Sequence, residues 1–130
     1  MEAFSIDADV PGGPDAARRA RGLVHEELAG RVPTGVLGDV VLLVTELVTN
    51  GVRHGGADSR SELHLRLEGG PSALRVEVED PGRKPQAVAP RPAEEGGGGG
   101  IGLQLVERLA SRWGVGDGPR TSVWFEFDCR

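Results

Sequence analysis

The amino-acid sequence predicts an α/β two-layer sandwich, in which a mostly antiparallel sheet carries helices on one face. Residues 14–54 carry apolar side chains at helical spacing, whereas residues 62–68 and 73–79 alternate strictly between polar and apolar side chains. A third helical segment and two more strand-like segments complete the chain. The 130 residues suffice for one domain, residues 1–130, with a hydrophobic core of its own.

The first part of the chain is expected to form one short strand and two helices. Pro14 follows two glycines and suits the first turn of the first helix, which Gly30 stops. Thr34 has the side chain of an N-cap for the second helix, and Gly55 follows the end of that helix. The expected elements are a strand at 4–6 and helices at 14–29 and 35–53.

The second part is expected to form a hairpin, a helix and two closing strands. The segment Gly69-Gly70-Pro71-Ser72 joins the two alternating stretches, which makes them neighbouring antiparallel strands. His64 points away from the leucines of its strand, so we interpret it as an exposed strand residue rather than a ligand. The expected elements are strands at 62–68 and 73–79, a helix at 101–112, and strands at 113–115 and 122–127.

Composition argues against several classes of function. The formal net charge of −5 argues against a nucleic-acid binder and against binding to an anionic membrane surface. The one cysteine, Cys129, leaves no disulfide framework and no cysteine-rich metal site. No apolar run is expected to approach the roughly 18 residues of a membrane span, and the first residues lack a secretory signal, so a cytoplasmic protein is expected.

Glycine and proline concentrate in residues 81–100. This stretch is too long and too poor in apolar residues to be an ordinary connection between two elements. A domain linker here would leave about 30 residues behind it, too few for a second domain. Residues 81–100 are therefore expected to form a mobile loop within one domain.

Glu46, Asn50 and His54 recur every fourth residue along the second helix. At about 100° per residue, the three side chains fall within a strip roughly 80° wide at the edge of the core-facing sector. Polar groups at that border are costly unless something polar meets them, which favours a cleft-lining site. The alternative is an amphipathic helix whose border positions are polar. For His54, the end of the helix explains a cation equally well.

Two downstream stretches carry related signals. Asp80 lies at a strand end, where its carboxylate can accept a hydrogen bond from a ligand's amino group or from its own backbone in a turn. The run 96–102 opens a helix, where glycines let the backbone approach an anion and the first N–H groups point toward it. A flexible linker is the alternative, but Gly102 lies inside the apolar helix, where a linker has no need of glycine. We therefore interpret the run as a phosphate site.

Taken in order, these motifs resemble the N, G1 and G2 boxes of the GHKL ATPase superfamily. The matching residues are Glu46 with Asn50, then Asp80 with Gly82, then Gly100-Ile101-Gly102-Leu103. Within that superfamily, the short chain and the stretches 46–55 and 112–127 resemble the anti-sigma factor serine/threonine kinases of the SpoIIAB/RsbW type. The resemblance covers residues 10–128 and implies the Bergerat fold, with a mobile ATP lid at 83–99.

The resemblance implies a role for each residue of the first two boxes. Asn50 would hold Mg²⁺ through its side-chain oxygen. Glu46 would orient or deprotonate the attacking hydroxyl. Asp80 would bind the adenine amine, and Gly82 would let the base lie against the backbone.

The third box and the last strand would contribute further contacts. The backbone of Gly100 and Gly102, within the segment Gly100-Ile101-Gly102-Leu103, would donate hydrogen bonds to the phosphates. The hydroxyl that the family carries near the adenine would belong to either Thr121 or Ser122.

By this resemblance the chain is expected to be an ATP-binding anti-sigma factor that uses ATP or ADP and Mg²⁺. It would phosphorylate a serine or threonine on a STAS-domain anti-anti-sigma factor, sequester a sigma factor, and form a homodimer without contacting nucleic acid. Lys84 stands where the family has a second glycine, and residues 96–100 are all glycine where members often carry an arginine or serine. Arg83, Lys84 or Arg91 would then have to supply a cation near the γ-phosphate. The alternative is a non-catalytic module that binds ATP and sequesters a partner.

Overall fold

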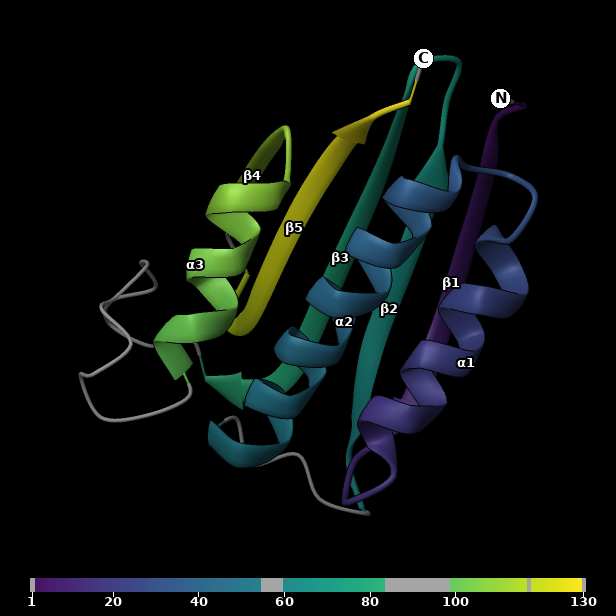
Figure 1. The fold of residues 1–130 in the computed structure, drawn as a ribbon. Helices are drawn as coiled ribbons and strands as arrows, with labels where there is room; N and C mark the ends of the chain where they lie inside the picture. Colours follow the sequence, from purple (N-terminus) through teal and green to yellow (C-terminus); the bar gives the residue numbers. More distant parts are fainter. Residues whose placement is uncertain (1, 55–59, 84–98, 117, 130) are drawn as a thin grey trace.

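An antiparallel sheet forms one layer of the molecule, and helices that lie on one side of it form the other (Figure 1). The computed structural model describes residues 2–54, 60–83, 99–116 and 118–129. Within these residues the sheet has five strands in the order β1-β2-β3-β5-β4, and each neighbouring pair is antiparallel. The elements are β1 (Phe4–Pro11), α1 (Ala16–Leu28), α2 (Thr34–His54), β2 (Glu62–Gly69), β3 (Ala73–Arg83), α3 (Gly99–Leu109), β4 (Arg112–Val115) and β5 (Arg120–Asp128).

This architecture confirms the two-layer sandwich expected from the sequence. α2 lies between α1 and α3, contacts both of them, and packs over the middle of the sheet (Figure 1). Strict alternation in the strands sends one set of side chains toward the helices, where they are buried. The strands contribute Leu63, Leu65, Leu67, Leu74, Val76, Val78, Val123, Phe125 and Phe127 to this core. Removal of this apolar surface from water is the main force that holds the two layers together.

Strand β1 is longer than the expected strand at 4–6, because it runs for eight residues and pairs with β2 along its whole length. Asp7 and Asp9 interrupt the apolar pattern of the sequence, but in the strand they point away from the core and are exposed. Their carboxylates bond to His64 and Arg66 on β2. These cross-strand pairs stabilise the polar face of the edge strand, so the acidic residues belong to the strand rather than to a loop.

Helix α2 begins at Thr34, one position before the expected start, and the Leu37 N–H donates to the Pro33 carbonyl at 3.0 Å in its first turn. Over Thr34–Arg53 it is long and apolar enough to span a membrane by length and composition, contrary to the expectation that no segment approaches that length. Its apolar flank packs against α1, α3 and β3. This packing is typical of the central core helix of a globular fold.

The ends of β3 and α3 also differ from the expected ones. β3 continues to Arg83, and its pairing with β5 shifts register between Glu79 and Arg83. α3 begins at Gly99 and ends at Leu109 rather than at residue 112. Most of the expected lid, residues 84–98, lies outside the described residues.

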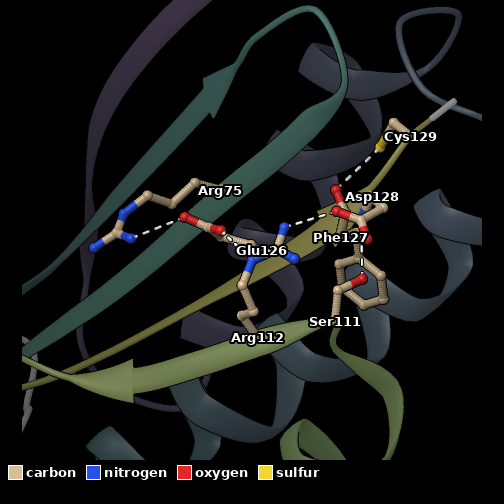
Figure 2. Close-up of polar contacts among 7 residues, drawn as sticks. All are labelled: Arg75, Ser111, Arg112, Glu126, Phe127, Asp128 and Cys129. Atoms are coloured by element: carbon tan, nitrogen blue, oxygen red, sulfur yellow. Dashed lines mark hydrogen bonds and ion pairs between the residues drawn. The ribbon is translucent and has the colours of Figure 1, made fainter.

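Arg112 belongs to β4 rather than to the end of α3. Its Nε donates to the Glu126 carboxylate at 2.8 Å and its second terminal nitrogen donates to Asp128 at 2.7 Å (Figure 2). Arg75 on β3 donates to the other oxygen of Glu126 at 3.1 Å. Glu126 therefore links β5 to the strands on both sides of it, which holds the short edge strand β4 in place.

Candidate functional site

Four segments that carry predicted site residues meet at one end of the molecule. α2 and β3 run toward this end, whereas α3 and β5 start from it (Figure 1, lower end). β3 and β5 are direct neighbours in the sheet, and α2 packs against both β3 and α3. The fold therefore brings Asn50, Asp80, the start of α3 and Thr121 to the same end, although they are far apart in the sequence.

Helix α2 and strand β3 approach each other closely at Gly51, the residue after Asn50. Gly51 is buried, and a Cβ atom added there would lie 3.1 Å from the Cβ of Asp80 and 3.6 Å from its Oδ2. The added atom would also lie 2.7 Å from Cδ2 of Leu63 on β2. The missing side chain at Gly51 thus lets the last turns of α2 lie directly against the carboxylate of Asp80.

Asp80 faces the helices because it continues the alternation of Val76 and Val78, which are both in the core. Asn50 and Asp80 are each half-buried. A carboxylate is a hydrogen-bond acceptor, and a carboxamide oxygen can also serve as a ligand to a hard cation. The pair therefore offers two different polar functions at the edge of the core, near the buried Leu63.

Glu46 lies one helical turn before Asn50 and is also half-buried, whereas the neighbouring Leu47 and Val48 are in the core. The spacing of four residues sets Glu46 and Asn50 on the same side of α2, about 6 Å apart along its axis. His54 is the last residue of α2. The placement of the His54 side chain lies outside what the structure describes. The polar side chains described on this side of α2 are therefore the carboxylate of Glu46 and the carboxamide of Asn50.

The end of the glycine run forms the first turn of α3. Residues 100–102 lie within the helix, which begins at Gly99. The first four N–H groups of an α-helix have no acceptor inside it, and this end of the helix dipole is positive. Leu103 has a different environment, because its side chain is buried and anchors the start of α3 in the core. The helix thus directs backbone donors to the end of the molecule that carries Asn50 and Asp80.

Thr121 and Ser122 point to opposite faces of the sheet. Thr121 shares the helix-facing side of β5 with Val123, because alternate residues of a strand point the same way. Ser122 lies on the outer side, where its hydroxyl donates to the Glu77 carboxylate at 2.7 Å. Ser122 is 5% exposed, and Gly116 lies against it so closely that an added Cβ would come within 3.0 Å of the hydroxyl oxygen. Of the two residues, Thr121 thus lies on the same side of the sheet as Asp80.

Gly51 lies beside the candidate site, and although the stretch 46–55 includes it, no sequence motif assigns it a role. A signal was available, because an isolated glycine inside an apolar helix costs about 1 kcal/mol relative to alanine and usually has a packing reason. That reason is the contact with Asp80, which lies on a strand two elements later in the chain. The motif around Asn50 gives no indication of which strand passes behind the helix.

Within the part of the chain that the structure describes, no three His, Cys, Asp or Glu side chains are grouped so that they could hold a metal ion. A divalent cation at this end could take the carboxamide oxygen of Asn50 as a ligand. Mg²⁺ is often bound in this way, by one or two protein oxygens together with waters and nucleotide phosphates.

Comparison with known proteins identifies a family for this chain. Residues 10–127 match the family model described as a histidine kinase-like ATPase domain. No match is found among the curated proteins.

Among the solved structures that match, two illustrate the shared fold. The RsbU and RsbW domains of Rv1364c from Mycobacterium tuberculosis match with a TM-score of 0.72 at 21% sequence identity, over 97% of this chain and 32% of theirs. The histidine kinase domain from the Erythrobacter litoralis EL346 blue-light activated histidine kinase matches with a TM-score of 0.59 at 28% identity, over 88% of this chain and 59% of its own. The chain therefore spans less than two thirds of the length of either structure.

Proposed function

The chain belongs to the histidine kinase-like ATPase domain family, and from this premise we propose that it binds ATP at the end of the molecule where α2, β3, α3 and β5 meet. The observation that carries the proposal is the close approach at Gly51, which sets the carboxylate of Asp80 beside the helix that bears Asn50. These two polar groups, the N-terminus of α3 and the neighbouring apolar core would then line one site. An adenine nucleotide would use all four of these features.

Each part of the site would contact a different part of the nucleotide. The carboxylate of Asp80 would accept a hydrogen bond from the exocyclic amine of adenine. Gly82 would let the base lie close to the backbone of β3, and the Thr121 hydroxyl would lie on the same side of the sheet. The N–H groups of residues 100–102 would donate to the phosphates, where the positive end of the helix dipole favours negative charge.

A magnesium ion would fit the same arrangement through Asn50. The carboxamide oxygen of Asn50 is a hard ligand on the helix that lies beside Asp80, and the phosphates would complete the coordination. Bound in this way, the ion would neutralise charge on the phosphates during transfer. Glu46, one turn away on the same side of α2, would orient the hydroxyl that attacks.

We further propose that the chain is an anti-sigma factor of the RsbW type, with serine/threonine kinase activity toward a STAS-domain protein. Its fold resembles that of a structure described as the RsbU and RsbW domains of a larger protein, which supports a partner-regulating role. In the reaction, the seryl or threonyl oxygen would attack the γ-phosphorus while the bond to the β–γ bridging oxygen breaks. ADP would leave, and the hydroxyl proton would pass to the Glu46 carboxylate. A sigma factor would be the second partner, and a homodimer the functional unit.

A second function is favoured by one specific observation. Residues 96–100 are all glycine, so this part of the chain supplies no side-chain cation for the γ-phosphate. The chain would then bind ATP and sequester a partner without transferring phosphate.

Transfer of radiolabelled phosphate from Mg-ATP to a STAS-domain substrate distinguishes the two functions. We expect Glu46→Gln to bind ATP as the wild type does but to transfer no phosphate. Asn50→Ala should lose the Mg²⁺-dependent part of ATP binding while keeping its circular dichroism spectrum, because Asn50 borders the core rather than filling it. Tight ATP binding by the wild type without any transfer would favour the non-catalytic function. Absence of ATP binding would contradict both.

A further inference from the structure

His64 lies on the outer face of the sheet, away from the candidate nucleotide site, and both nitrogens of its ring contact carboxylates. Nδ1 lies 2.8 Å from Oδ1 of Asp9, and Nε2 lies 2.9 Å from Oδ1 of Asp7. A carboxylate only accepts hydrogen bonds, so each ring nitrogen must carry a hydrogen to make its bond. The two contacts together therefore require the doubly protonated, positively charged imidazolium.

We propose that His64 is a protonation-dependent latch that holds the edge strand β1 onto β2. Asp7 and Asp9 both belong to β1, and within the described residues β1 pairs with β2 alone. Loss of one proton would leave a neutral ring with a single N–H, which can donate to only one of the two carboxylates. The lone pair on the other nitrogen would then face a carboxylate oxygen, so that contact would turn from attraction to repulsion.

Other charged groups around His64 modify this balance without reversing it. Arg66 on β2 donates to the same Oδ1 of Asp7 at 2.9 Å. Glu79 of β3 is directly opposite His64 in the ladder. His64 and Asp9 also line an outer-face concavity of about 520 Å³, which they share with Arg60, Ser61, Glu62, Glu79, Pro81 and Arg120. The nearest acceptors of the ring, Asp7 and Asp9, both favour its charged form.

The contacts of His64 with Asp7 and Asp9 should weaken as the pH rises. The hydrogen bond to Asp9 raises the pKa of His64, partial burial opposes this shift, and the bond to Asp7 adds to it. A raised pKa in the folded state means that the latch is fully formed below the ordinary value of 6.5 and is lost as the pH rises through the raised value. The apolar side of β1, which includes the buried Val10, does not titrate. The strand would therefore open more often at high pH rather than detach.

Nuclear magnetic resonance of ¹⁵N-labelled protein tests the charge state of His64 without any substitution. We expect both ring nitrogens of His64 to have the chemical shifts of the protonated form at pH 5.5 and to titrate together with a midpoint above 6.5. Asp9→Asn should lower that midpoint by about 0.5–1 pH unit, because it removes the acceptor at Nδ1. A midpoint at or below pH 6.5 in the wild type would overturn the proposal.

Hydrogen exchange tests the effect on β1. The protection of β1 amides, corrected for intrinsic exchange rates, should fall several-fold between pH 6 and pH 8.5 relative to amides of β5. His64→Gln should remove this pH dependence, whereas His25→Gln on the exposed face of α1 should preserve it. Equal pH dependence of protection in the wild type and His64→Gln would also overturn the proposal.

Discussion

Asp80 and Glu79 are adjacent carboxylates, yet the pleat of β3 sends their side chains to opposite faces of the sheet. Glu79 lines the concavity on the outer face, whereas Asp80 meets Gly51 of α2 on the inner face. The two residues have the same charge and are similarly half-buried. Glu79 is therefore a matched control for any effect that is attributed to the chemistry of Asp80.

Asp80→Asn should weaken ATP binding by about 1.5–3 kcal/mol, which corresponds to about 10- to 150-fold in Kd, because it removes a charged hydrogen-bond acceptor. Calorimetric titration with ATP and with inosine triphosphate, which lacks the exocyclic amine, locates the lost interaction. The wild type should prefer ATP, and Asp80→Asn should lose that preference. Glu79→Gln should keep both the affinity and the preference. An unchanged preference in Asp80→Asn would disprove the adenine contact.

Thr121 and Ser122 provide a second pair that separates the two faces of the sheet. Thr121→Val should lower nucleotide affinity with little change in stability, because the hydroxyl is on the side of the proposed adenine site. Ser122→Ala should keep the affinity but lower the free energy of unfolding by about 0.5–1.5 kcal/mol, because it removes the donor to Glu77. Titration with ATP and urea denaturation of both variants measure the two effects. The opposite pattern would assign the adenine contact to Ser122.

At the scale of elements, the junction between α2 and β3 depends on the lack of a side chain at Gly51. A single added methyl group would press on Leu63, whose side-chain end can move, and on the Cβ of Asp80, which can move less. Gly51→Ala should therefore be tolerated with a small loss of affinity. Gly51→Val should lower the free energy of unfolding by about 1–3 kcal/mol through overpacking and should also weaken ATP binding.

Gly38 is the matched control on the same helix. It is exposed, and a Cβ atom added there would meet nothing within 4 Å. Gly38→Ala should raise the free energy of unfolding by about 0.4–1 kcal/mol, because alanine loses less backbone freedom on helix formation. Chemical denaturation of the three variants tests the contrast. A stability of Gly51→Val equal to that of the wild type would mean that the helix and strand are not in close contact.

The helices and strands show which parts of the structure could be predicted from the sequence. Periodicity identified all three described helices and the hairpin, because each buries one regular face in the core. The periodicity predicted only the first residues of β1, because Asp7 and Asp9 interrupt the apolar pattern. These two residues are compatible with a strand because they bond to His64 and Arg66 on β2. The periodicity also assigned Arg112 to a helix, although the partners of that residue lie on β5. Local patterns fail where a long-range contact decides the conformation.

In the candidate site, too, local motifs could be recognised but long-range contacts could not be predicted. Asn50 and Asp80 could be named from motifs, and the structure adds that they lie on elements that touch. Gly51 could not be assigned a role, and Thr121 could not be separated from Ser122, because both questions depend on which face of the sheet lies under α2. Residues 84–98, which include the expected lid cations Lys84 and Arg91, lie outside the described residues.

At the scale of the whole molecule, the two sides of the sheet differ in chemistry. The helix-covered side holds the hydrophobic core and the proposed nucleotide site at one end. The outer side carries two groups of ion pairs, one between Asp7 and Asp9 of β1 and His64 and Arg66 of β2, the other around Glu126 of β5 with Arg75 and Arg112. Arg75 also stacks on Trp124 there, with its guanidinium carbon 4.2 Å from the ring centroid. Ionisation on the outer face should therefore control stability rather than nucleotide recognition.

This division predicts how stability responds to acid. The Arg112 guanidinium, followed by that of Arg75, lowers the pKa of Glu126 from its ordinary value of 4.5, and Arg66 with His64 lowers the pKa of Asp7 from 3.8. A lowered pKa in the folded state gives stability that is present above the unfolded value and is lost as the pH falls through the folded one. Urea midpoints should therefore decline steadily as the pH falls below about 4.5, with an unchanged m-value.

Glu126→Gln tests which carboxylate carries this acid response. The variant should be less stable than the wild type at pH 6, because a neutral amide replaces the carboxylate that both arginines bind. Its decline with acid should be shallower, because one of the groups that must be protonated is gone. Glu26→Gln, on the exposed face of α1, should follow the wild-type curve. If Glu126→Gln also follows the wild-type curve, the ion pairs of Glu126 with Arg75 and Arg112 contribute nothing measurable to stability, which is common for exposed ion pairs. The strands β3, β5 and β4 would then be held together by their core side alone.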